Sequence, residues 1–259
     1  MSMDILTPTP ATRHEIKRVK REPKRRTLSV EQVERLTPNM QRIVFTSPEL
    51  VDFESAGADD HVKLFLADGQ GGLCMRDYTP RSFDRAQGRL TIDFALHEAG
   101  PATAWALAAK VGETLQIGGP RGSSLVTDDF DWYLLIGDET ALPSIGRRLE
   151  ELRAGVPVTT VVLVETAADA QEIATRTAWT AKWVAREGQS RDDTALLSAA
   201  LVELTLPEGD GYVWIGAEGA TARSLRAYMA ETRGHPKIWM KASGYWAAGD
   251  PGAHEKIDD

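Results

Sequence analysis

The chain has 259 residues, a formal net charge of −8, and 42% hydrophobic and 26% charged residues, as in ordinary globular proteins of one or two domains. No apolar run approaches the roughly 20 residues that span a bilayer, and the first residues lack the apolar core of a secretory signal, so we expect no membrane insertion. A single cysteine, Cys74, excludes an internal disulfide and a four-thiolate iron–sulfur site. Together these features predict a cytoplasmic protein.

Positive charge gathers at the N-terminus, where residues 1–26 hold eight Lys or Arg and three Asp or Glu, whereas the rest of the chain is acidic. A basic arm is one way to bind nucleic acid or anionic lipid. This arm has no interleaved aromatic residues and precedes an acidic body, so we expect no nucleic acid partner. The sequence predicts a basic, flexible tail over residues 1–25.

Short strand-like segments follow one another between residues 26 and 126. Gly, Pro and Asp-rich turns separate them, and they lie at residues 27–36, 40–46, 60–66, 75–83, 89–96 and 114–118. One Ala-rich helix is expected from Ala102 to Ala109, after Pro101. Such a series of short strands predicts an N-terminal antiparallel Greek-key β-barrel over residues 26–126.

Apolar runs alternate with helical stretches from residue 127 onward. Strands are predicted at 132–136, 158–164, 181–185, 211–215 and 237–241. Helices are predicted at 142–154, 169–175, 195–204 and 219–232. Continuous apolar strands between helices indicate a parallel sheet covered on both faces. We therefore expect an α/β domain over residues 127–259, joined to the barrel by a linker at 125–131.

The end of one predicted barrel strand carries the residue types that a flavin requires. Arg76 and Tyr78 stand on alternate residues, with Thr79 next. An arginine can clamp a phosphate through two parallel N–H bonds, a tyrosine can stack on a flat ring, and a threonine can reach the ring edge. Further along, Gly100-Pro101-Ala102 opens the predicted helix, whose free N–H groups suit a pyrophosphate. Alone, the first pattern also fits an ordinary exposed strand.

Three segments in this order, at residues 76–81, 100–106 and 118–122, resemble the flavin-binding half of the siderophore-interacting protein family, ferric-siderophore reductases related to ferredoxin–NADP reductases. The resemblance extends from Arg26 to Gly249. It implies FAD as cofactor, NADH or NADPH as electron donor, and a ferric siderophore as substrate. The cofactor-binding residues that it implies are Arg76, Tyr78, Thr79, Asp93, Phe94, His97, Pro101, Ala102, Thr103, Trp105, Ala106, Thr140, Glu218, Tyr245 and Trp246. Of these, His97 also fits an ordinary surface histidine, and Tyr245 and Trp246 either flank the flavin or pack the domain interface.

Two loops of the second domain suit a nicotinamide cofactor. Ligands of open parallel sheets sit off the carboxyl ends of the strands, and Thr140 follows the first strand at a helix N-terminus, where a phosphate can bind. Asp138 and Glu139 in this loop, and Glu218 in the second loop, either contact the cofactor or cap the helices.

The charged residues in and near these loops favour different electron donors. Their carboxylates would repel an additional phosphate and so favour NADH. Arg147, Arg148 and Arg186 lie nearby in the sequence and would reverse that preference.

Catecholate and hydroxamate oxygens bind ferric iron much better than ferrous iron, so reduction releases the metal. An anionic chelate needs a positive patch beside the flavin, for which Lys63 and Arg121 are the candidates, with Arg81 third. Lys63 also fits a surface lysine, and Arg121 a second phosphate clamp. Members of the family commonly carry an arginine after Gly-Tyr-Trp, where this chain has Ala247.

Two other functions remain compatible with the sequence. One is a general flavin or ferredoxin-type reductase, with ferredoxin as an alternative donor, and the other is a non-redox siderophore-binding protein. The five histidines and one cysteine show no metal-ligand spacing, so we expect no protein-bound metal centre.

Overall fold

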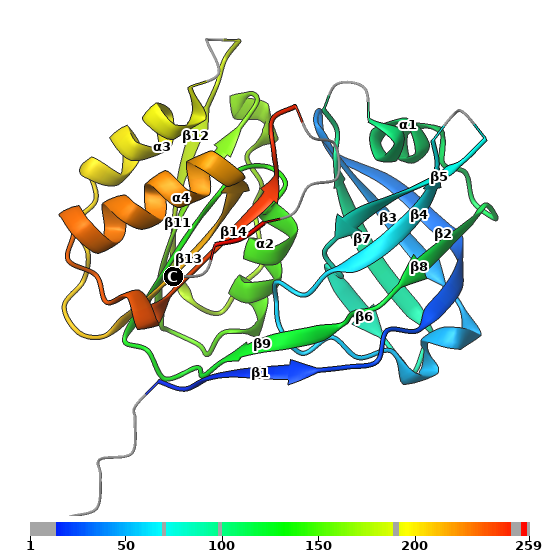
Figure 1. The fold of residues 1–259 in the computed structure, drawn as a ribbon, viewed down its shortest axis with the longest axis horizontal. Coiled ribbons are helices and arrows are strands. Elements are labelled where there is room, and N and C mark those ends of the chain that lie inside the picture. Colours follow the sequence, from blue (N-terminus) through cyan, green and yellow to red (C-terminus); the bar gives the residue numbers. More distant parts are fainter. Residues whose placement is uncertain (1–13, 69–70, 98–99, 189–191, 250–254, 258–259) are drawn as a thin grey trace, which may run out of the picture.

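The computed structural model describes residues 14–68, 71–97, 100–188, 192–249 and 255–257. Two units lie side by side in Figure 1: a unit built mainly of strands from the N-terminal half, and a layered unit of strands and helices from the C-terminal half. The order of elements along the chain follows the predicted change of pattern near residue 127.

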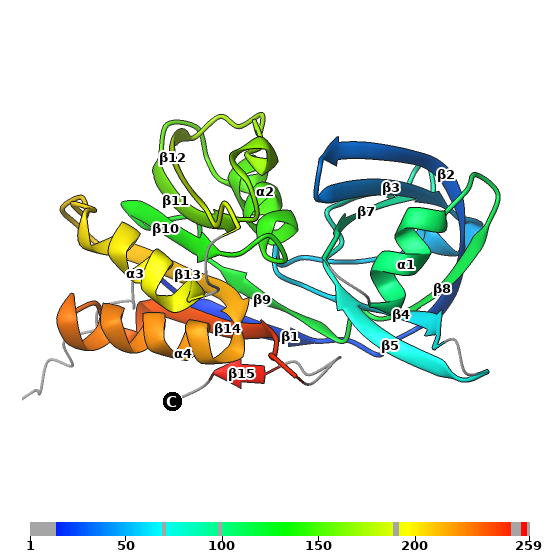
Figure 2. The same ribbon diagram turned by 90° about the horizontal axis from the view of Figure 1, so that it is seen from above.

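The first unit is a seven-stranded antiparallel sheet that curves around one hydrophobic core (Figures 1 and 2). Its strands are β2 (Arg25–Thr37), β3 (Met40–Thr46), β4 (Val62–Ala67), β5 (Leu73–Tyr78), β6 (Ser82–Asp84), β7 (Arg89–Ala95) and β8 (Thr114–Gly118), in the order β5-β4-β8-β2-β3-β7-β6. Strand β8 enters between β2 and β4, which gives the non-sequential order of a Greek key. Alternate residues such as Leu28 and Val30 fill the core, and α1 (Pro101–Ala108) packs on the same core through Ala102 and Ala106. The predicted antiparallel barrel domain is confirmed.

The second unit is a mainly parallel sheet with helices on both faces (Figure 2). Its parallel strands are β10 (Trp132–Gly137), β11 (Pro157–Val164), β12 (Ala178–Ala185), β13 (Gly211–Glu218) and β14 (Met240–Trp246), and β15 (Glu255–Ile257) adds an antiparallel edge. Helix α2 (Leu142–Glu151) packs on one face, whereas α3 (Asp193–Val202) and α4 (Gly219–Ala227) pack on the other. All residues of β10 are buried, which explains the continuous apolar run. The predicted α/β architecture is confirmed.

Two predicted elements of the second unit are wrong in detail. The helix expected over 169–175 is only a 3₁₀ turn, Ala167–Asp169, because the Asp169 carboxylate accepts bonds from Thr166 and from Thr37 and Asn39 of the first unit. The last strand does not span 237–241. A 3₁₀ turn occupies Lys237–Trp239, and β14 then runs on to Trp246. The turn Tyr228–Thr232 continues α4, and Pro48–Asp52 is a short 3₁₀ helix in the first unit.

The basic N-terminal segment contributes a strand, so the expectation of a flexible tail is wrong for its described part. Strand β1 (Ile16–Lys20) pairs antiparallel with β9 (Gly122–Val126), which lies partly inside the expected linker. The buried His14 ring stacks on Phe130, with the centroids 4.0 Å apart, and bonds to Asp129 and Asp210 on the second unit. Residues 1–13 lie outside the described residues.

Polar side chains join the two units along a buried interface. Arg147 of α2, only 4% exposed, donates to the Ser55 hydroxyl and carbonyl and to the Pro80 carbonyl of the barrel. The barrel residue Asp59 accepts bonds from Trp214 Nε1 at 3.0 Å and from Lys241 Nζ at 2.5 Å. These contacts hold α2, β13 and the start of β14 against the barrel.

Candidate active site

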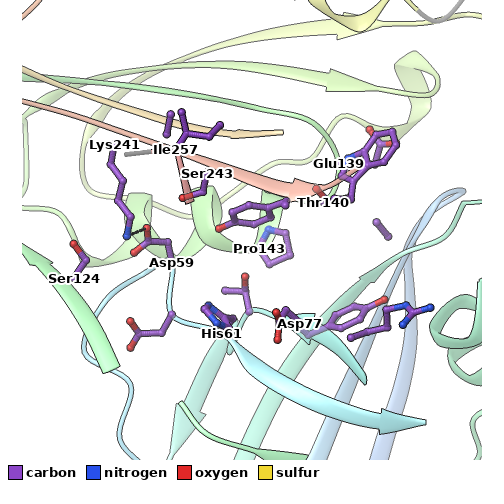
Figure 3. Close-up of a pocket in the computed structure, with 18 of the residues that line it drawn as sticks. Asp59, His61, Asp77, Ser124, Glu139, Thr140, Pro143, Lys241, Ser243 and Ile257 are labelled. Atoms are coloured by element: carbon purple, nitrogen blue, oxygen red, sulfur yellow. Dashed lines mark ion pairs between the residues drawn. The ribbon is translucent and has the colours of Figure 1, made fainter. Parts of the chain in front are cut away.

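A large cleft lies between the barrel and the carboxyl ends of β10 and β14 (Figure 3). Its volume is about 1410 Å³, which exceeds the range of about 300–1,000 Å³ typical of a pocket for one small molecule. Both units supply its walls, and Figure 3 shows Asp77 and His61 from the barrel facing Thr140 and Pro143 from the α/β unit. The cleft therefore has room for two ligands between the units.

The barrel wall of the cleft carries the predicted flavin residues. Tyr78, at the end of β5, lines the cleft and packs on Phe94 with the ring centroids 4.6 Å apart. Burial raises the pKa of Tyr78, so the ring stays neutral and suits contact with a flat aromatic ligand. Arg76 lines the same wall, and within the described residues its guanidinium bonds only to the Met75 carbonyl, at 2.9 Å. Its remaining N–H groups can therefore receive a phosphate.

The start of α1 has the features of a pyrophosphate site. His97, Gly100 and Pro101 line the cleft where the helix begins. Among the described residues, no side chain caps this end of the helix, and the buried Thr103 hydroxyl in its first turn has no hydrogen-bond partner. Free N–H groups and an unsatisfied hydroxyl fit the phosphates of a dinucleotide. The residues present thus fit FAD, as predicted for this helix.

Other predicted cofactor residues lie behind the cleft. Ala102 and Ala106 belong to the barrel core, and Trp105 packs against Phe45 and Phe94 in that core. Phe94 is fully buried. These side chains support α1 and Tyr78 from behind, so their roles in binding FAD remain a prediction.

A chain of hydroxyl groups connects the two walls of the cleft. Thr79 Oγ1 lies 3.0 Å from Ser144 Oγ on α2, which lies 2.8 Å from the Tyr245 hydroxyl on β14. Burial raises the pKa of Tyr245 above its ordinary value, so it stays protonated and can donate within the chain. The sequence did not single out Ser144, because its neighbours in this chain come from strands distant in sequence.

The loop after β10 forms the opposite wall. Gly137 ends this strand next to Gly216. A side chain at position 137 would not fit, because its Cβ would lie 2.6 Å from the Gly216 carbonyl oxygen. The buried Asp138 carboxylate accepts bonds from the Thr140 amide at 2.9 Å and from Trp246 Nε1 at 2.9 Å. Thr140 and Trp246 line the cleft. Asp138, which is absent from the described lining, therefore fixes the loop and Trp246 in place.

Glu139 lies at the rim of this loop, paired with Arg186 at 2.9 Å. Burial, followed by the charge of Asp138, raises the pKa of Glu139 to about 7, although Arg186 opposes the rise. Arg186 is itself buried and also binds Asp193 through two bonds of 2.9 Å. Of the arginines expected to favour NADPH, Arg147 and Arg186 are thus engaged within the protein.

Two predicted cofactor residues have structural partners. Glu218 caps α4, accepting a bond from the Thr221 amide at 3.0 Å, and is absent from the described cleft lining. Asp93 reaches the lining but holds Arg42 through two bonds of 2.7 Å.

Of the three predicted substrate cations, only Arg121 lines the cleft. Lys63 pairs with Asp77 at 2.8 Å, and about one-third of its side chain is exposed. It is absent from the described cleft lining. Arg81 lies in the domain interface, where its nearly buried guanidinium binds Glu150, so the structure does not place it in a substrate site. In the part of the chain that the structure describes, no group of His, Cys, Asp and Glu is arranged to hold a metal ion, and no helix is long and apolar enough to cross a membrane.

The antiparallel barrel followed by a parallel-sheet unit is the ferredoxin-reductase-like fold. A solved FAD/NAD-binding domain of a Vibrio cholerae nitric oxide dioxygenase superposes with a TM-score of 0.67 over 83% of this chain and 96% of that one, at 17% identity. At this identity the similarity concerns the fold.

The chain belongs to the siderophore-interacting protein family. The family model for siderophore-interacting protein matches residues 130–249, and that for the siderophore-interacting FAD-binding domain matches residues 29–74 and 69–124.

Individual relatives cover nearly the whole chain. An Escherichia coli NADPH-dependent ferric-chelate reductase is 32% identical over 89% of this chain and 96% of its own length. Ferric vibriobactin reductase of Vibrio cholerae is 25% identical over 75% of this chain and 74% of its own. The crystal structure of a siderophore utilization protein from T. fusca has a TM-score of 0.86 and 32% identity, covering 92% of this chain and 98% of that one.

Proposed function

We propose that this protein is an FAD-dependent, NAD(P)H-dependent reductase that releases iron from ferric siderophores in the cytoplasm. The observation that carries the proposal is the shared cleft, which is lined by Tyr78 and Thr79 from the barrel and by Thr140 and Trp246 from the α/β unit. A flavin held there accepts a hydride and passes electrons singly, chemistry that belongs to the cofactor. The protein supplies position, shielding from water and charge.

The residues on the two walls have separate roles. Arg76 and the N-terminus of α1 bind the phosphates of FAD, and Tyr78, backed by Phe94, supports its ring from the side that lines the cleft. The chain from Thr79 through Ser144 to Tyr245 fixes the distance between the walls at the ring edge. Thr140 receives the nicotinamide cofactor off the carboxyl end of β10.

The relatives named as ferric-chelate and ferric vibriobactin reductases support the substrate class. The Escherichia coli relative is named as NADPH-dependent, which supports NADPH as donor. In the loop after β10, burial raises the pKa of Asp138 and of Glu139, and Glu139 pairs with Arg186, so these carboxylates oppose a further phosphate only weakly.

Anaerobic stopped-flow spectroscopy tests the proposal. FAD-loaded protein is mixed with NADPH or NADH, and the absorbance of oxidised flavin is followed. Ferric siderophores are then added together with a chromogenic chelator specific for ferrous iron. We expect the flavin to bleach and then to reoxidise as ferrous iron forms.

Each alternative function has its own outcome in this experiment. Bleaching without ferrous iron would indicate a general flavin reductase. Reduction only by photoreduced ferredoxin would identify a different donor. Protein that cannot bind FAD but binds ferric siderophores would be a carrier, and that result would refute the enzyme.

A further inference from the structure

The basic strand β1 forms one wall of the cleft. Ile16, Arg18, Val19 and Lys20 line it together with Arg121, from the turn before β9. Figure 3 shows Ser124 of β9 on the side of the cleft where the Lys241–Asp59 pair lies. The segment that composition alone marks as a solvated arm is therefore part of the site.

Strand β1 is fixed at both ends, so its side chains have defined positions. At its start, His14 bonds to Asp129 at 2.8 Å and to Asp210 at 3.0 Å. At its end, Lys20 lies opposite Gly122, and the next amide, that of Arg21, donates to the Arg121 carbonyl at 2.8 Å. Gly122 permits this approach, because a Cβ there would lie 2.3 Å from the Val19 carbonyl oxygen.

The charges of this wall are unequal. Among the lining carboxylates, Asp59 pairs with Lys241 and Asp77 pairs with Lys63. By contrast, neither Lys20 nor Arg121 has an ion pair within the described residues, and both are exposed. In the described lining, β1 and the segment from Arg121 to Ser124 contribute three basic residues and no acidic one, although acidic residues outnumber basic ones in the whole chain. The wall is therefore locally positive on a negative protein.

This wall lies close to the expected position of the flavin ring. Tyr78 pairs with Val62 on the neighbouring strand β4, and Lys63 of β4 pairs with Gly118 at the end of β8. Arg121 follows Gly118 by three residues. Two strand spacings, about 10 Å, thus separate Tyr78 from Gly118, the residue at which the turn to Arg121 begins. A chelate held against this wall would lie beside the ring edge.

We propose that Lys20 of β1, acting with Arg121, forms an anion-binding wall that selects negatively charged ferric chelates. This inference rests on the proposed function and specifies the charge of its substrate. The wall supplies positive charge to a cleft in which Ala247, also in the lining, stands where members of the family commonly carry an arginine. Lys20 is a specificity determinant rather than a catalytic residue.

Binding and catalysis are measured on the FAD-loaded full chain with two probes. The anionic probe is a metal tris-catecholate, and the neutral probe is a metal tris-hydroxamate. Gallium(III) complexes, which are not reduced, report binding by titration, and ferric complexes report kcat and KM. The variants are Lys20→Ala and Lys20→Glu. The control is Lys17→Ala, since Lys17 is also an exposed lysine of β1 but pairs with Glu15 and is absent from the described lining.

We expect Lys20→Ala to weaken binding of the gallium tris-catecholate and to raise KM for its ferric counterpart about three- to ten-fold, as one exposed charge at about 8 Å from a trianion should do in screened water. Lys20→Glu should have about the square of that effect. In the Lys20 variants, binding of the gallium tris-hydroxamate, kcat and the FAD content should remain unchanged. Lys17→Ala should match wild type in every one of these measurements.

Equal loss for both probes, equal loss in Lys17→Ala, or no loss in Lys20→Glu would overturn the inference. If the wild-type protein binds the gallium tris-catecholate in a Lys20-dependent way but reduces no ferric chelate, the proposed reductase function fails while the anion-binding wall stands.

Discussion

The buried carboxylate of Asp59 should make the protein sensitive to acid in a defined pH range. Asp59 belongs to the barrel, and its side chain is 6% exposed. It binds Trp214 and Lys241, both from the α/β unit. Burial alone would raise its pKa, but the charges of Lys241 and Arg148, with the two hydrogen bonds, lower the pKa from 3.8 to about 2.

The size and sign of the effect follow from this shift. A shift from 3.8 to about 2, at 1.36 kcal/mol for each pKa unit, corresponds to about 2 kcal/mol of stability. Because the folded-state pKa is depressed, this stability is present above pH 3.8 and is lost as the pH falls through about 2. Asp59→Asn keeps the shape and removes the charge. We therefore expect it to lower the free energy of unfolding at pH 7 by about 2 kcal/mol.

Denaturant unfolding followed by tryptophan fluorescence measures this difference at several pH values. The gap between wild type and Asp59→Asn should shrink towards zero between pH 4 and pH 2. Glu208→Gln, which also converts an acid to its amide but at an exposed position, should match wild type throughout. A gap that is independent of pH, or absent at pH 7, would refute the reasoning.

Three further predictions concern the site. Arg76→Ala should weaken FAD binding about 10- to 100-fold, since a charged hydrogen bond to phosphate contributes about 1.5–3 kcal/mol; the flavin absorbance retained after gel filtration and a titration with FAD report the loss. Thr79→Val should break the hydroxyl chain to Ser144 and lower kcat with little loss of fold, which stopped-flow traces and circular dichroism separate; unchanged flavin reduction would contradict the role. Glu139 has a raised pKa of about 7 against 4.5, so its stabilising contribution, present below pH 4.5, is lost as the pH rises through 7. Glu139→Gln should remove this fall, of up to about 3 kcal/mol, from the pH dependence of unfolding, and identical slopes in the two proteins would contradict it.

Local sequence patterns predicted several of the residues that line the cleft. The alternation of Arg76 and Tyr78 at a strand end and the Gly-Pro start of α1 placed these groups correctly at the cleft, because strand and helix periodicity fix which side a side chain faces. Similarly, the unbroken apolar run of β10 predicted a buried strand, and the loop at its carboxyl end lines the cleft through Thr140.

Local sequence patterns could not predict the contacts between segments that are distant in the sequence. Asp169 resembled part of a helix, but its bonds to Thr37 and Asn39 hold it in a turn. Arg81 and Lys63 were cations near the flavin segment, and only their pairing with Glu150 and Asp77 shows that their charges are neutralised locally.

The sequence by itself determined the fold class and the family and predicted the FAD-binding segment, since each depends on residue types at short spacing. The tertiary structure decided which charges face the cleft. Strand β1 carries Lys20 to the cleft only because β9, more than 100 residues later, pairs with it. Composition cannot show that pairing, because the net field at a cleft depends on which ion pairs form across the fold.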